Sequence, residues 1–136
     1  MRVEQIISGN RVLATILYKE PPAAGIKFFT SDDNPLQVGK HSYPKGKVIK
    51  PHQHCPVTIN RFATMQEVLY IEKGKLKVLV YTENGELVTQ KVLGPGDMMV
   101  LMEGGHGFEV LEDLEMVEIK QGPYIPESKK ALEVKS

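Results

Sequence analysis

Residues 67–93, EVLYIEKGKLKVLVYTENGELVTQKVL, contain two runs of β-branched, aromatic and leucine residues on either side of a turn. The turn contains Asn84-Gly85, and both residues tolerate the positive φ angles that a two-residue type I′ hairpin requires. The first run, 67–81, is interrupted at Lys73-Gly74, which predicts two consecutive strands. The stretch therefore predicts antiparallel β-structure in this part of the chain.

Runs of the same kind continue in both directions. RVLATILY and GIKFF lie upstream, whereas MMVLM, FEVLED and EMVEIKQ follow the tight turn GPGD at 94–97. Only residues 126–134 show even a weak helical period. Many short strands at fairly even spacing are typical of a β-sandwich or a small barrel, so we predict an all-β fold.

Length, charge and cysteine content narrow the class of protein. The 136 residues suit one compact domain. Lys+Arg and Asp+Glu both number 17, so long-range attraction to nucleic acid or to an anionic membrane is not expected. The single cysteine, Cys55, excludes an intramolecular disulfide. The N-terminus lacks a secretory apolar region and no apolar run reaches transmembrane length, so we expect a cytoplasmic protein.

Two histidines, His52 and His54, are separated by one residue. Residues two apart share one face of a strand but point in nearly opposite directions on a helix. Pro51 and the β-type surroundings favour a strand, so both imidazoles should project into the same space. The same alternation predicts that Cys55 is a small buried residue on the opposite face.

A glutamate and a further histidine are also expected to face inward. Glu67 alternates with Leu69 at the start of a strongly apolar strand, and a buried carboxylate is costly unless it is paired or coordinated. His106 lies between glycines in EGGHGFEVL and alternates with Phe108. Each residue alone is more often an ordinary strand or core residue, and only the combination points to a metal site.

The spacing of these residues resembles the two motifs of the cupin superfamily. The first motif is matched by Gly46, His52, Gln53, His54, Glu67 and Gly74. Residues 96–108, GDMMVLMEGGHGF, are similar to the second motif. The closing segment GGHGFEVLEDLEMVEIKQGPY is similar to small single-domain bacterial cupins, some of which are encoded beside surface-polysaccharide genes.

The resemblance implies a double-stranded β-helix, which is a small jelly-roll barrel of two antiparallel sheets. It implies a single domain, with strands in 1–40 packed on the barrel, a barrel core at 41–123 and a C-terminal tail at 124–136. Cupins often pair through an exposed strand face, so it also implies a homodimer. The family's metal ligands fall on His52, His54, Glu67 and His106.

Two departures from the family pattern affect the loops around this site. The family usually has three or four residues between the second histidine and the glutamate, whereas this chain has the twelve residues CPVTINRFATMQ. We expect a longer hairpin that turns near Asn60-Arg61 and overhangs the barrel mouth. In the second motif, Met102 stands where proline is common, and Gly104 is one residue nearer to His106 than usual.

Three imidazoles and one carboxylate suit a divalent first-row metal, and iron, manganese, nickel and zinc all remain candidates. Four protein ligands on an octahedral ion leave two positions for water, dioxygen or a chelating substrate. Arg61 is the candidate anion contact, because its planar guanidinium suits a carboxylate or phosphate. The alternative for Arg61 is a solvated charge on the hairpin.

A metal site of this kind is compatible with two main classes of function. The first is a metal-dependent enzyme acting on a small polar molecule. By analogy with polysaccharide-linked relatives, this would be isomerisation or epimerisation of a sugar or nucleotide-sugar, with a dioxygenase as the rival. The second is a non-catalytic module that binds a small ligand, which the shortage of an acid or base beyond the ligands favours. A purely structural metal is a third option.

Overall fold

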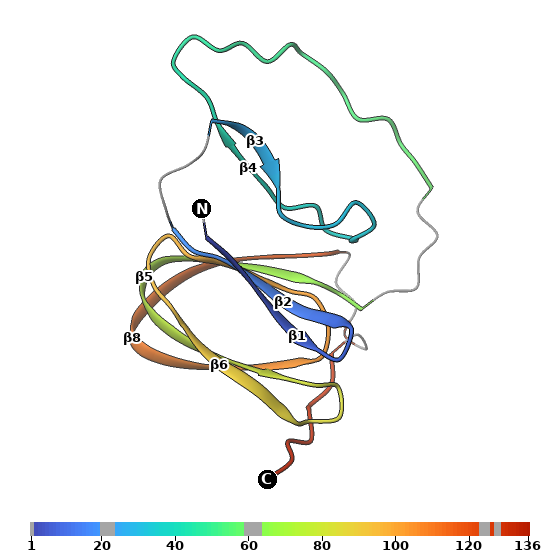
Figure 1. The fold of residues 1–136 in the computed structure, drawn as a ribbon, viewed down its shortest axis with the longest axis vertical. Coiled ribbons are helices and arrows are strands. Elements are labelled where there is room, and N and C mark those ends of the chain that lie inside the picture. The colour runs from blue at the N-terminus through green and yellow to red at the C-terminus, as the bar shows by residue number, and fades with distance from the viewer. Residues whose placement is uncertain (1, 20–23, 59–63, 123–125, 127–128) are drawn as a thin grey trace. The chain divides into compact units, whose positions relative to one another are not determined.

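The regular elements in the described part of the chain are strands. The computed structural model describes residues 2–19, 24–58, 64–122, 126 and 129–136, and the regular elements within these ranges are eight strands (Figure 1). The predicted all-β character is therefore confirmed. The chain divides into two compact units, one formed by residues 1–21 with 64–136 and the other by residues 22–63.

The larger unit is a six-stranded antiparallel sheet. Its strands are β1 (Val3–Ser8), β2 (Arg11–Leu17), β5 (Glu67–Tyr81), β6 (Leu87–Leu93), β7 (Met98–Leu101) and β8 (Gly105–Lys120). They are ordered β1-β2-β7-β5-β6, and β8 pairs with β5. The first residues of β5 pair with both β7 and β8, so β7 and β8 lie on opposite sides of β5.

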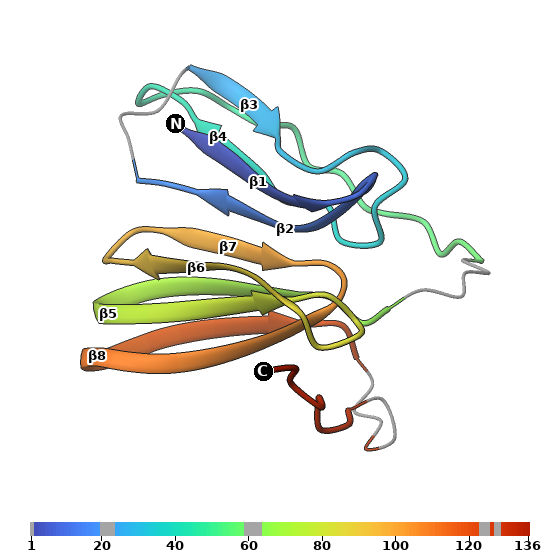
Figure 2. The ribbon, with the colours of Figure 1, turned by 60° about the horizontal axis from the view of Figure 1, so that its bottom comes forward.

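The sheet curls around β5. The register between β5 and β8 shifts at several points between Ile71 and Leu76, and Gly74 in this stretch has a φ of 88°. Register shifts of this kind bend a strand and increase its twist. The long strands β5 and β8 therefore bend together into a strongly curled half-barrel (Figure 2).

Two predicted strand breaks are corrected by this arrangement. Residues 67–81 were expected to form two strands separated at Lys73-Gly74, but they form the single strand β5. The segments FEVLED and EMVEIKQ likewise belong to the single strand β8. The irregular residues shift the pairing without ending it, because the ladder between β5 and β8 resumes on both sides of them.

The hairpin between β5 and β6 is present, but its turn differs from the predicted type. Gly85 has a φ of 86°, whereas no described residue other than glycine has a positive φ, so Asn84 does not adopt a type I′ conformation. The loop is longer, and Thr82 closes it by donating its N–H to the carbonyl of Glu86 at 2.9 Å. The C-terminal tail meets this turn, since the N–H of Lys135 donates to the carbonyl of Gly85 at 2.9 Å.

The core of the larger unit is built from alternate residues of its strands. Leu69 and Ile71 are fully buried, as their alternation with Glu67 predicts. Beyond the register shifts, Leu76, Val78 and Val80 provide the buried face of β5. Residues of the other strands complete the cluster: Ile6, Leu13, Ala14, Ile16, Leu93, Met99 and Leu101.

The smaller unit contains one short hairpin followed by an extended segment. Strands β3 (Gly25–Phe28) and β4 (Gly39–Ser42) pair in antiparallel register. The Gln37 side-chain amide organises the connection by donating to the carbonyls of Ser31 at 2.9 Å and Asn34 at 2.8 Å. Residues 43–58 belong to no strand. None of the described residues in either unit forms a helix long and apolar enough to cross a membrane.

Candidate metal centre

The curl of the larger unit brings Glu67 and His106 together. Glu67 is the first residue of β5, whereas His106 is in register with Val80, near the other end of the same strand. In a flat sheet these positions would be far apart. In the curled sheet the imidazole Nε2 of His106 lies 3.5 Å from a carboxylate oxygen of Glu67.

The two side chains differ in their exposure. The Glu67 side chain is 18% exposed and that of His106 is 32% exposed. The ring of Phe108 stacks on His106 with centroids 5.3 Å apart. Phe108, whose alternation with His106 led us to expect both on an inward face, is 42% exposed. Among the described strands β8 pairs only with β5, so it is an edge strand of the sheet.

Burial shifts the ionisation of both groups towards the uncharged forms. The pKa of Glu67 is raised, chiefly by burial and then by the nearby Glu118, against smaller opposing effects of Lys120 and Lys129. The pKa of His106 is lowered, again chiefly by burial. Burial therefore favours the neutral imidazole, and in that form its approach to Glu67 is not an ion pair. A neutral imidazole is the form that binds metals.

We expect that Glu67→Gln raises the stability of the metal-free protein at neutral pH. Because the folded-state pKa of Glu67 is raised, its favourable contribution is fully present below the unfolded-state pKa and is lost as pH rises through the folded-state value. Glutamine keeps the shape of the side chain without this cost. Thermal denaturation with a chelator should show a higher midpoint for the variant at pH 7 and a smaller gain near pH 4.

The exposed Glu72 on the same strand provides the matched control. Glu72→Gln should shift the midpoint much less than Glu67→Gln does. A Glu67→Gln midpoint at pH 7 equal to or below that of the unsubstituted protein would contradict the expected cost of ionising Glu67.

In the smaller unit, His52 and His54 lie side by side on the extended segment. Their ring centroids are 5.4 Å apart with an angle of 69° between the planes. The Nδ1 atom of His52 lies 3.0 Å from the carbonyl oxygen of Lys50. When Nδ1 carries the proton and donates it to this carbonyl, Nε2 is left free to bind a metal.

The predicted strand around these histidines is absent from the structure. Residues 50–58 pair with no other strand, so alternation does not separate buried from exposed positions there. Cys55 is accordingly exposed, and the prediction that it is buried is wrong. The proximity of the two histidine rings comes from the extended backbone itself, in which side chains two residues apart can lie on the same side.

The predicted ligand set takes two residues from each unit, and the structure describes each pair by itself. Within either unit, the described residues include no group of three or more His, Cys, Asp or Glu placed to hold a metal ion. Arg61, the candidate anion contact, lies outside the described residues, as does the predicted turn near Asn60.

The sequence interpretation missed Glu118, which lies diagonally opposite Glu67 in the ladder between β5 and β8 and contributes to raising the pKa of Glu67. The available signal was its alternation with Met116 and Lys120 on β8.

Comparisons of the chain with protein-family models, with curated proteins and with solved structures found no match. The resemblance to cupins therefore rests on the spacing of the motif residues in the sequence.

Proposed function

We propose that the protein is a divalent-metal-binding cupin in which one ion is held by His52, His54, Glu67 and His106. The observation that carries this proposal is the 3.5 Å approach of Glu67 and His106 from opposite ends of the ladder between β5 and β8. A divalent cation would favour ionisation of the partly buried carboxylate and would use the neutral imidazole as a ligand. His52 and His54 supply a second pair of nitrogens.

The proposed jelly-roll barrel is supported by the curl of the larger unit. Strands β5 and β8 pass from one part of the curled sheet to the other, and both change their register near Gly74. We also propose a homodimer, which the exposed apolar side chains of these strands support. Val110, Val117 and Ile119 on β8 are 57%, 41% and 57% exposed, although each belongs to a regular strand.

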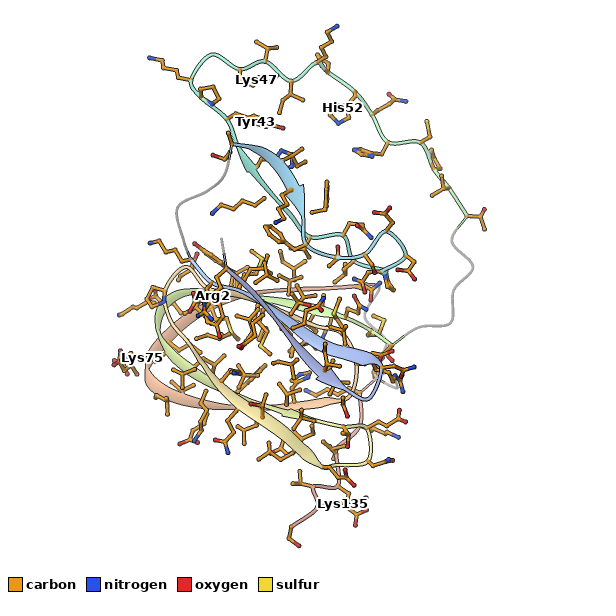
Figure 3. The ribbon with its side chains drawn as sticks, in the orientation of Figure 1. Arg2, Tyr43, Lys47, His52, Lys75 and Lys135 are labelled. Carbon is orange, nitrogen blue, oxygen red and sulfur yellow. The ribbon has the colours of Figure 1, made fainter. Side chains whose placement is uncertain are left out.

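The substrate that we favour is a small anionic molecule such as a nucleotide-sugar. Residues 34–66, which include His52 and His54, contain four lysines and Arg61 but no aspartate or glutamate. Figure 3 shows Lys47 and His52 on the same extended segment, and the Lys47 ammonium lies 5.9 Å from the ring centroid of Tyr43. A positively charged surface beside the histidines attracts phosphate and carboxylate groups.

The reaction that we propose is an isomerisation or epimerisation of such a sugar. A bound divalent ion would polarise a substrate carbonyl or lower the pKa of a coordinated water. The lysines of the extended segment would bind the anionic part of the substrate, and Arg61 would contact it in the same way. A metal-dependent dioxygenase is the alternative reaction, and a non-catalytic ligand-binding module is the alternative class.

The test is metal analysis of protein purified without an affinity tag, followed by activity assays on the same sample. We expect about one iron, manganese, nickel or zinc ion per chain, and turnover of a nucleotide-sugar that stops when the metal is chelated. Oxygen consumption without sugar turnover would favour the dioxygenase, and ligand binding without turnover would favour the module. Absence of bound metal after supply of all four ions would overturn the proposal.

A further inference from the structure

The smaller unit has no apolar core of its own. Among its described residues, 24–58, the single buried one is Thr30. Several of its large apolar side chains are exposed, namely Ile26, Phe28, Val48, Ile49 and Val57. A unit of only about 40 residues usually needs disulfides, a metal or a partner surface to be stable. Because Cys55 is the single cysteine of the chain, a disulfide within the unit is excluded.

Residues 43–58, which we call the histidine segment, are held by few interactions. Every residue in this range is exposed, and none belongs to a strand. The hydrogen bonds that its described residues make are local, such as the one from the N–H of Lys47 to the carbonyl of Pro44 at 3.2 Å. A segment without ladder hydrogen bonds or buried apolar contacts belongs to the least stable regions of a protein.

Glu67 and His106, by contrast, are held in place by the sheet. Both lie on paired strands of the larger unit, where the His106 Nε2 atom is 3.5 Å from a carboxylate oxygen of Glu67. Half of the proposed ligand set is therefore positioned by the fold, whereas the other half lies on a segment that the fold does not hold. When ligands lie on such a segment, part of the free energy of metal binding is used to order it.

We propose that the histidine segment becomes ordered when His52 and His54 bind the ion that Glu67 and His106 also hold. This inference rests on the proposed function. Ordering of the segment also fixes its three lysines, so the surface proposed to attract the anionic substrate is completed only in the metal-loaded protein. The cost of ordering the segment lowers the affinity for metal below that of a site with all four ligands in place.

Hydrogen exchange followed by mass spectrometry tests this inference on the full chain, without metal and with Zn²⁺ or Mn²⁺. In the metal-free protein, the amides of the histidine segment should exchange at nearly the rate of an unfolded chain. With metal bound, they should exchange more slowly by about 10-fold or more. The amides of β5 are the internal control, because they are paired with neighbouring strands and should be protected in both states.

Two variants of the larger unit test the origin of the ordering. His106→Ala and Glu67→Gln each remove a proposed ligand that lies outside the histidine segment. At a metal concentration that just saturates the unsubstituted protein, both variants should lose most of the added protection. His41→Ala is the matched control, because His41 lies on β4 of the smaller unit and is not a proposed ligand. It should keep the full metal-induced protection.

Calorimetric titration of the same samples separates this inference from the proposed function. If the unsubstituted protein binds metal but exchange in the histidine segment is unchanged, the inference fails and the proposed function stands. The same conclusion follows if the segment is already protected without metal. Full protection retained by both His106→Ala and Glu67→Gln would also overturn the inference, because the ordering would then not depend on these ligands. If the unsubstituted protein binds neither ion, the proposed function and this inference both fail.

Discussion

Replacement of Gly74 by alanine should destabilise the protein by roughly 2–5 kcal/mol. Gly74 has a φ of 88°, a conformation that costs a residue with a side chain about 1–2 kcal/mol. A methyl group at this position would also overlap the carbonyl oxygen of Asp113 on β8 and press against that of Glu112. Both neighbours are backbone atoms of a paired strand, so the overlap is relieved only by moving β8 away from β5.

Gly9→Ala separates the steric effect from the backbone effect. Gly9 has a φ of 62°, and nothing lies within 4 Å of an added methyl group. Urea denaturation should therefore show only the backbone cost of about 1–2 kcal/mol for Gly9→Ala and a larger loss for Gly74→Ala. If both variants lose the same free energy of unfolding, the close approach of β8 to Gly74 has no effect on stability.

The strands were readable from the sequence because their signals are local. The alternation of Leu69 and Ile71 predicted their burial, and Asn84-Gly85 predicted the hairpin between β5 and β6. The same local signals did not distinguish a strand end from an irregularity inside a strand. The dipeptide Lys73-Gly74 is compatible with a strand end and with an irregularity inside a strand. In this structure it is an irregularity, because β8 pairs with β5 again beyond the register shifts.

The candidate site depends on contacts that alternation does not specify. Glu67 approaches His106 because the sheet curls, and this curl arises from register shifts that no single strand reveals. Glu118 was missed because β8 carries several acidic residues, and only the register shows which of them is the diagonal neighbour of Glu67 and can raise its pKa. The strand predicted for His52 and His54 failed for a related reason, because alternation has meaning only where a neighbouring strand supplies a covered face.

The second large effect is expected for His106→Ala, which should weaken binding of a divalent metal by about 100-fold or more. The variant removes one of four proposed ligands, and loss of a group that merely supports a ligand already costs about 10–100-fold. His106 is about one-third exposed and lies outside the buried apolar cluster, so the protein should remain folded. Titration with Mn²⁺ and Zn²⁺ measures the loss, and circular dichroism checks the fold.

His41→Ala is the matched control for this variant. His41 lies on β4, in register with Ile26, and its ring contacts Tyr43 edge-on with centroids 5.8 Å apart. It is not among the proposed ligands, so its loss should leave metal affinity unchanged. If His106→Ala kept full affinity while His52→Ala and His54→Ala lost it, the metal would be bound through the extended segment alone. The approach of His106 to Glu67 would then need a different explanation, since two neighbouring histidines form a weaker and more exposed site than four converging ligands.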